Sequence, residues 1–436
     1  MKRIAIGTLA ALFAFACAPP NNNNNNQNIE PDVVEVRDEI VTDTSWTADH
    51  VYQLKTHIYV KDGATLTIAA GTRVQGESGS SLVITRTGKL DATGTASKPI
   101  VFTSSKPEGT RLAGDWGGIV MLGAAPINVS GGSTAIEGFA STTDARTQYG
   151  GTDAAHNCGT LKYARVEFAG FVLLNNNELN GLTLGGCGNA TTIDYVQVHR
   201  GADDGVEVFG GTVDLKHVLI TQPEDDGLDW DFGWTGRVQF LVIQQGTETG
   251  NNGIEADNNK NNKEATPRSA PEIWNLTLVG AGRNAGGATK SIGMTLREGT
   301  AGRLHSVIVY GFADNAIDVD GASSAAQMNS GALRIEGSIF YGNKGTTTSL
   351  PVESTDNDMG LDEVAKLTEA GNQNRLIDPL LADPRNLEAP SFKPLQDSPA
   401  LLNAMPPPGG FFSAASFVGA IGSDDWTASW TAFPAN

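Results

Sequence analysis

The chain has 436 residues, of which 52 are glycine, 18% are charged and 7% are aromatic. This composition is typical of short strands joined by tight turns, and it argues against a helical protein. The formal net charge of −19 argues against nucleic acid or an anionic membrane surface as a partner, because either would repel the chain. A cation, or a polymer that binds through hydroxyl groups and cations, fits this charge.

The N-terminus has the pattern of an export signal. Lys2 and Arg3 supply positive charge, and the apolar run over 4–15 that follows is too short to span a bilayer. Small residues at Ala14 and Ala16 suit signal-peptidase cleavage. We therefore predict a signal peptide over residues 1–16.

Cys17 directly follows a small residue, which resembles the lipobox of bacterial lipoproteins. Ala14 and Phe15 depart from that motif, which usually has Leu and a small residue there. We expect Cys17 to be lipidated and to hold the protein at a membrane. Ala18 replaces the aspartate of inner-membrane lipoproteins, so the resemblance implies the outer membrane and the cell surface. A secreted or periplasmic protein without the lipid is the alternative.

An asparagine-rich tract, residues 21–28, follows the cysteine. Such a polar, low-complexity tract cannot bury a core, and we interpret residues 17–45 as a lipidated N-terminus with a flexible tether. From Trp46 short apolar strands begin, at 57–60, 65–68, 72–74, 81–84 and 100–103. We interpret them as the N-terminal cap coils of a solenoid.

A loop-rich insert over about 124–159 precedes the regular part of the chain. Besides Cys17 the chain has two cysteines, Cys158 and Cys187, which flank about one coil. In an exported protein such an even pair predicts a disulfide.

One short phrase recurs six times between residues 182 and 319. The copies are Gly181-Leu182-Thr183-Leu184, Gly205-Val206-Glu207-Val208, Gly227-Leu228-Asp229-Trp230, Gly253-Ile254-Glu255-Ala256, Gly293-Met294-Thr295-Leu296 and Ala316-Ile317-Asp318-Val319. Each follows a second strand of the pattern apolar-x-x-apolar-x-apolar. These second strands begin at Tyr163, Ile193, Leu215, Val238, Ile273 and Leu304.

The spacing of these phrases indicates a solenoid. The offset from second strand to phrase is 13 in three copies (206−193, 228−215 and 317−304), and the period is near 22 residues (228−206). At this period each repeat is one coil that cannot bury its own core. We predict a parallel β-helix over 46–345, and a C-terminal extension over 346–436 whose aromatic end caps or covers the coils.

If each phrase is a strand, its alternate residues point outward and stack in columns. The first outward column is Thr183, Glu207, Asp229, Glu255, Thr295 and Asp318, and the second contains Asp231, Asp257 and Asp320. With coils ~4.8 Å apart, neighbouring carboxylates repel by roughly 3 kcal/mol per pair at an effective dielectric constant of about 20. Protonation, an Arg or Lys between coils, or a divalent cation must offset this repulsion.

Carboxylate oxygens are ligands that calcium prefers. The candidate calcium ligands are therefore Glu207, Asp229, Asp231, Glu255 and Asp257. The alternative is that solvent alone satisfies them. Asp and Asn also introduce most phrases, and there we expect turn residues whose side chains bond nearby amides. These are Asp203, Asp204, Asp225, Asp226, Asn252 and Asn315.

Several motifs, in one order, resemble a family of bacterial surface β-helix proteins. They are Asp62-Gly63-Ala64-Thr65-Leu66-Thr67-Ile68, Gly114-Asp115-Trp116-Gly117-Gly118-Ile119, Asn180-Gly181-Leu182-Thr183-Leu184-Gly185-Gly186, Asp203-Asp204-Gly205 through Phe209-Gly210-Gly211, and Asp425-Trp426-Thr427 to Trp430. The resemblance covers nearly all of the chain beyond Asp43. It implies an all-β fold, a right-handed parallel β-helix similar to the pectin-lyase-like superfold. That family has no settled activity, so the resemblance assigns no catalytic residue.

Our leading hypothesis is a non-catalytic, lipid-anchored surface protein that binds glycans, partner proteins or calcium. The alternative is a polysaccharide lyase or glycoside hydrolase that uses Glu207, Asp229, Asp231 and Glu255, although the Gly-His-Gly and Arg-Ile-Lys motifs of polygalacturonases are absent. A purely structural or adhesive stalk is a third possibility. A cleft beside the acidic columns, walled by the surface loops over 257–270 and 281–290 and with a nearby Arg or Lys, would favour the enzyme. A flat, exposed acidic strip would favour binding or structure.

Overall fold

The structure, a computed structural model, describes residues 32–139, 141–174, 177–282, 291–353 and 357–436. The predicted signal peptide, Cys17 and the asparagine-rich tract lie outside the described residues, as does most of the predicted loop over 281–290. Within the described part, no helix is long and apolar enough to cross a membrane.

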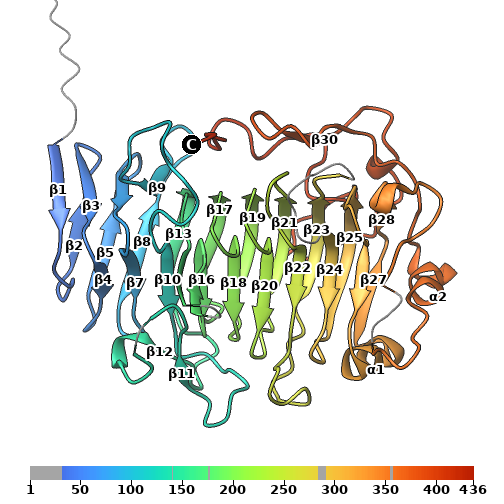
Figure 1. Cartoon of the computed structure of the whole chain (residues 1–436), viewed down its shortest axis with the longest axis horizontal. Helices are drawn as coiled ribbons and strands as arrows, with labels where there is room; N and C mark the ends of the chain where they lie inside the picture. Colours follow the sequence, from blue (N-terminus) through green and yellow to red (C-terminus); the bar gives the residue numbers. More distant parts are fainter. Residues whose placement is uncertain (1–31, 140, 175–176, 283–290, 354–356) are drawn as a thin grey trace, which may run out of the picture. The chain divides into compact units, whose positions relative to one another are not determined.

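Two long parallel sheets run side by side along residues 32–341 (Figure 1). The nine-stranded sheet consists of β4 (His57–Val60), β7 (Ser81–Ile84), β10 (Ile119–Leu122), β16 (Leu182–Gly185), β18 (Val206–Phe209), β20 (Leu228–Asp231), β22 (Asn252–Ala256), β24 (Ile292–Leu296) and β26 (Ile317–Val319). The main path of the fifteen-stranded sheet is β1 (Asp32–Val36), β3 (His50–Leu54), β6 (Arg73–Gly76), β9 (Ile100–Ser104), β13 (Gly159–Glu167), β17 (Thr192–His199), β19 (Asp214–Thr221), β21 (Arg237–Gln244), β23 (Glu272–Val279), β25 (Gly302–Tyr310) and β27 (Leu333–Glu336). The strands β2 (Thr44–Trp46), β5 (Thr65–Ile68), β8 (Lys89–Thr93) and β28 (Ile339–Tyr341) pair beside that path.

The remaining elements are short. Three antiparallel pairs are β11 (Thr134–Ala135) with β12 (Gln148–Tyr149), β14 (Phe171–Leu174) with β15 (Asn177–Leu179), and β29 (Leu381–Asp383) with β30 (Ser391–Pro394). The helices are α1 (Ala322–Ser330) and α2 (Glu363–Thr368), with 3₁₀ turns η1 (Ala145–Thr147), η2 (Asn343–Gly345), η3 (Ala370–Asn372) and η4 (Pro399–Leu401).

The six predicted phrases lie on consecutive coils of the nine-stranded sheet. Their first apolar residues pair in register and are fully buried: Leu182, Val206, Leu228, Ile254, Met294 and Ile317. One phrase therefore contributes one layer of a continuous apolar core, which no coil could bury alone. This confirms the predicted all-β parallel β-helix, and the arrangement fits a right-handed one.

Each long strand of the other sheet bends at one residue with a positive φ angle. The bend residues are Tyr163, Tyr195, His217, Phe240, Asn275 and Ser306, with φ between 46° and 62°. The ladders skip these positions, so each coil has three sides, namely one short strand and two halves of a long one. Neighbouring bend rings stack, with centroids of Tyr163 and Tyr195 4.3 Å apart and of Tyr195 and His217 4.2 Å apart.

Two boundaries predicted from the sequence need correction. The first long strand does not start its repeat at Tyr163, because the register aligns Leu161 with Ile193 and Tyr163 is a bend residue. The β-helix also starts before residue 46. Strand β1 (Asp32–Val36) already pairs with β3, so residues 32–45 are part of the coils and not of a tether.

The C-terminal extension covers the fifteen-stranded sheet (Figure 1, red). The ring centroids of Phe412 and Trp274 of β23 lie 6.1 Å apart, and those of Trp430 and Tyr163 of β13 lie 5.9 Å apart. The last segment therefore runs back across successive coils. The side chain of Gln197 donates to the carbonyl of Ala432 at 2.7 Å and accepts from its amide at 3.0 Å. Outward-pointing polar side chains thus bind the main chain of this segment.

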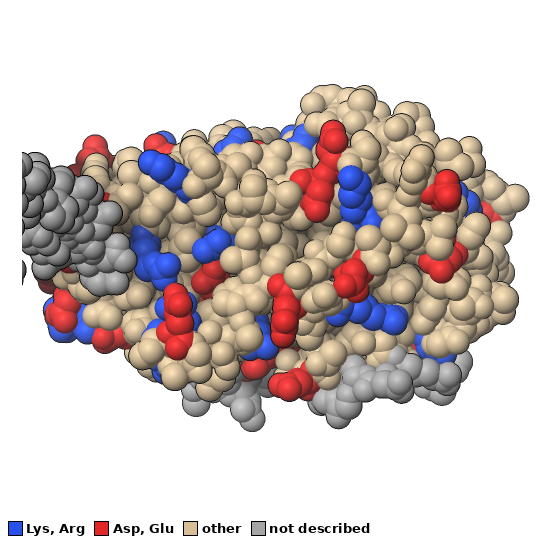
Figure 2. Space-filling view, turned by 90° about the horizontal axis from the view of Figure 1, so that it is seen from above, with Lys and Arg blue, Asp and Glu red and all other residues tan. Residues whose placement is uncertain are grey.

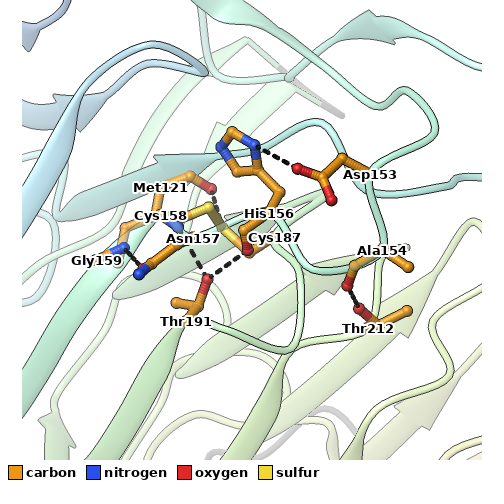
Figure 3. The surroundings of a disulfide bond; sticks show 10 residues. All are labelled: Met121, Asp153, Ala154, His156, Asn157, Cys158, Gly159, Cys187, Thr191 and Thr212. Carbon is orange, nitrogen blue, oxygen red and sulfur yellow. Dashed lines mark hydrogen bonds and ion pairs between the residues drawn. A yellow bond between two sulfur atoms is a disulfide. The ribbon is translucent and has the colours of Figure 1, made fainter. Parts of the chain in front are cut away.

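Cys158 and Cys187 form a disulfide with their Cα atoms 5.8 Å apart (Figure 3). Cys158 immediately precedes β13 and Cys187 follows β16, so the bond joins the end of the insert to the adjacent coil. The Thr191 hydroxyl accepts from the amide of Cys158 at 2.9 Å and donates to the carbonyl of His156 at 3.3 Å. The bond is fully buried.

Candidate acidic cation site

The first outward column is aligned as the sequence predicts. Thr183, Glu207, Asp229, Glu255, Thr295 and Asp318 pair with one another on consecutive strands. Within it we call Glu207, Asp229 and Glu255 the acidic column. These side chains point away from the core, yet Glu207 is only 7% exposed, and Asp229 and Glu255 are partly buried. The site is therefore neither a flat exposed strip nor an open acidic cleft.

The insert contributes to the cover of this column. Tyr149 of β12 is buried and packs against Phe209 of β18, with ring centroids 6.1 Å apart. Burial raises the pKa of the Tyr149 hydroxyl, and the charges of Asp231 and Glu207 raise it further. On the face drawn in Figure 2, acidic and basic side chains are interspersed. That face therefore shows no continuous acidic field.

Carboxylates from three coils converge at Asp229. One set of oxygens, from Asp204, Glu207 and Asp229, lies within 4.8 Å of one another, and a second set, from Asp226, Asp229 and Glu255, does so too. Asp229 belongs to both sets. Its Oδ1 atom is buried and accepts no hydrogen bond from any residue that the structure describes. A buried carboxylate oxygen without a partner is costly, which points to a proton or a cation at this place.

The turn residues beside the column form a ladder of their own. The amide of Asp204 donates to Asn180 Oδ1 at 3.3 Å, the amide of Asp226 donates to Asp204 Oδ1 at 2.9 Å, and the amide of Asn252 donates to Asp226 Oδ1. The sequence interpretation of amide-bonding turn residues holds for Asp204 and Asp226, whereas Asn252 Oδ1 accepts from the Thr295 hydroxyl. The amides, however, belong to the next coil and not to the residue's own turn.

Burial dominates the electrostatics of these groups. It raises the pKa of Asp204, Glu207, Asp226 and Asp229 well above the usual range, and neighbouring carboxylates raise each pKa further. A hydrogen bond of 2.6 Å from the amide of Asn180 to Glu207 Oε2 opposes this rise for Glu207. At neutral pH the cluster therefore retains protons unless a cation replaces them.

The second predicted column is partly neutralised by an arginine. Asp257, Arg297 and Asp320 follow the paired strands at successive positions, as their backbone bonds to Trp230, Ala256 and Leu296 show. Arg297 Nε lies 2.8 Å from Asp257 Oδ1, and its Nη2 atom also donates to Glu255. Asp231 lies one coil away, and burial and the charge of Asp257 raise its pKa. Of the ways to offset the repulsion that the sequence suggested, an arginine between coils is therefore present beside Glu255 and Asp257.

The structure also contains a cleft that sequence reasoning missed. Its volume is about 830 Å³, and its walls are the insert near Asn128–Glu137 and the loop near Asn259–Thr266. The sequence analysis considered a cleft walled by 257–270 and 281–290; the first loop does form a wall, and most of the second lies outside the described residues. The insert lacks any periodic pattern, so no sequence signal placed Glu137 here.

The fold and this site define the class: a parallel β-helix with a covered column of carboxylates on its nine-stranded sheet. The chain belongs to the family of the pectate-lyase-like β-helix domain, whose family model matches residues 38–380, more than three quarters of the chain. Comparisons with curated proteins and with solved structures found no match. Family membership establishes the fold but not an activity, because this fold carries many functions.

Proposed function

We propose that the protein is a non-catalytic, lipid-anchored β-helix of the outer-membrane surface that binds calcium at the acidic column. The observation that carries this proposal is that Asp229 belongs to two sets of converging carboxylates and has a buried Oδ1 atom that accepts no hydrogen bond from a described residue. Calcium takes six to eight oxygen ligands at about 2.3–2.6 Å. Small movements of Asp204, Glu207 and Asp229, completed by water, would supply such a shell.

The surroundings of the column support binding over lyase chemistry. A lyase needs a basic residue that reaches the sugar, and Arg297, which pairs with Glu255 of the column, is held there by Glu255 and Asp257. His199, fully buried, donates to the carbonyl of Pro434 in the C-terminal segment, so it is not available either.

A glycoside hydrolase is the second candidate, and one residue favours it. Burial and the charge of Glu178 raise the pKa of Glu137 to about 7, and Glu137 lines the cleft. A carboxyl that is half protonated near neutral pH suits a general acid. Release of reducing ends from a polysaccharide, abolished by Glu137→Gln, would favour this candidate.

Calorimetric titration of metal-free protein with calcium tests the main proposal. We expect a dissociation constant of about 10⁻⁴–10⁻³ M, the range of extracellular calcium modules, and at least about tenfold weaker binding in Asp229→Asn. The matched control is Asp91→Asn, because Asp91 is an exposed carboxylate on a strand of the other sheet. No heat of binding and no change in melting temperature at 10 mM calcium would overturn the proposal.

The anchor has a separate test. Cys17→Ser should move the protein from the membrane fraction to the soluble fraction, and mass spectrometry of the wild-type N-terminal peptide should find a lipid on Cys17. If wild type and variant fractionate alike, the lipid-anchored part of the proposal is wrong, whatever the calcium result.

A further inference from the structure

The cleft beside Tyr149 is a built cavity. Two walls that are far apart in sequence are joined at their base by a cluster of buried asparagines. Asn128 Nδ2 donates to Asn258 Oδ1 at 2.8 Å, and Asn259 Nδ2 donates to Asn128 Oδ1 at 3.0 Å. All three side chains are buried. A satisfied buried polar network holds both walls in one arrangement, which lowers the cost of ordering a ligand site.

The floor of the cleft is aromatic and one wall carries an unpaired carboxyl. The rings of Tyr149, Phe209 and Phe232 form a row that lines the cleft. The ring centroids of Tyr149 and Phe209 lie 6.1 Å apart, and so do those of Phe209 and Phe232. Glu137 lines the cleft and accepts no hydrogen bond from any described residue. The other lining acid, Glu264, is already paired with Arg268.

The charge of the lining selects among ligands. No Lys, Arg or His is among the described residues that line the cleft. An acidic sugar would bring a second carboxylate beside Glu137, and a neutral sugar would offer Glu137 hydroxyl donors but no counter-charge beyond that of the exposed Lys260. An ammonium group would pair with Glu137 and could also contact the aromatic floor.

We propose that this cleft binds a short oligosaccharide of amino sugars, with a sugar ammonium on Glu137 and a sugar ring against Phe232. The polar wall residues Thr134 and Asn261 are suited to sugar hydroxyls. A volume of about 830 Å³ lies within the range of small-ligand sites. A lysine-rich peptide is less suited, because it has no ring hydroxyls for Thr134 and Asn261 to bind. The site is separate from the acidic column and does not need calcium.

Titration with four probes in the presence of chelator tests the proposal. The probes are a glucosamine tetrasaccharide, its fully N-acetylated counterpart, a galacturonate tetrasaccharide and tetralysine, all at pH 7, where about half of the Glu137 carboxyl is ionised and the amines are at least partly protonated. We expect the glucosamine tetrasaccharide to bind at least about tenfold more tightly than each of the others, because only it combines ammonium and sugar. Equal binding of the amino and N-acetylated sugars, or tighter binding of tetralysine, would overturn it. Since chelator is present, failure of the calcium proposal leaves this outcome unaffected.

Variants localise the binding. Glu137→Gln should weaken glucosamine binding about tenfold and leave binding of the N-acetylated sugar unchanged. Phe232→Ala should weaken both. Glu108→Gln is the matched control, since the Glu108 side chain is exposed and outside the lining of the cleft. If Glu137→Gln melts like wild type and binds glucosamine equally well, the assignment of this cleft is refuted.

Discussion

Replacing Asp229 by Asn should stabilise the calcium-free protein at alkaline pH and weaken its response to calcium. Oxygens of Asp229 lie within 4.8 Å of those of Glu207 and of Glu255. At that separation and an effective dielectric constant of about 20, each pair of charges costs 332/(20 × 4.8), about 3.5 kcal/mol. Asparagine has nearly the same shape and no charge, so it relieves this repulsion.

Protonation of Asp229 limits the free-energy cost of this charge repulsion and makes that cost depend on pH. Burial raises the pKa of Asp229 in the folded state, so its contribution to stability is largest below its unfolded pKa and is lost as pH rises through the folded one. With an unfolded pKa of about 3.9, keeping one Asp protonated costs 1.36 × (8 − 3.9), about 5.6 kcal/mol, at pH 8, and about 1.5 kcal/mol at pH 5. We expect Asp229→Asn to stabilise the protein by about 3–5 kcal/mol at pH 8 and by less than about 1.5 kcal/mol at pH 5.

Thermal unfolding in chelator and in 10 mM calcium measures both effects. For the 405 residues from 32 to 436 (436 − 31), an unfolding entropy of about 2.1 cal/mol/K per residue converts 3–5 kcal/mol into about 4–6 °C. Calcium at about 100 times its dissociation constant adds about 2.7 kcal/mol to wild type and, with binding at least about tenfold weaker, at most about 1.4 kcal/mol to the variant. A variant that is less stable than wild type in chelator at pH 8, or that gains as much from calcium, would refute this reasoning.

Three further changes test other parts of the structure. Arg297→Gln should cost about 1–3 kcal/mol, more at pH 8 than at pH 5, and should increase the stabilisation by calcium, as paired melts would show. Removing both Cys158 and Cys187 by serine substitution should cost about 3–4 kcal/mol, the chain-entropy value for 29 residues, and reductant should then leave the melting temperature unchanged. Trp430→Ala should cost about 3–5 kcal/mol and speed proteolysis of the C-terminal segment, with the coils left intact.

The register of the acidic column was predictable because it follows from two periodicities. Strand alternation sends Glu207, Asp229 and Glu255 outward, and the coil period brings them side by side. The stacked apolar residues of the core were predictable from the same two periodicities. A resemblance in a few glycine-rich motifs pointed to the same fold, and the family match over residues 38–380 confirms it.

The cover of the column was not predictable, because it depends on segments without a period. Tyr149 comes from an insert whose strands are two residues long, and nothing local indicates which coil it will meet. The bend at Tyr163 was missed because aromatic residues seldom adopt a positive φ angle. Strand β1 was mistaken for tether because Asp32 and Glu35 make it look like polar linker.

The returning C-terminal segment changes how the coils respond to stress. In an ordinary repeat protein each unit senses only its neighbours, so an end can fray while the middle stays folded. Here the C-terminal segment contacts two distant coils: its Phe412 packs against Trp274, and its Trp430 packs against Tyr163. Coils that are not in direct contact therefore both pack against the C-terminal segment. If one of these coils unfolds, the segment loses contacts there, and its packing on the other coils is weakened. The expected result is a solenoid that opens as a single cooperative unit.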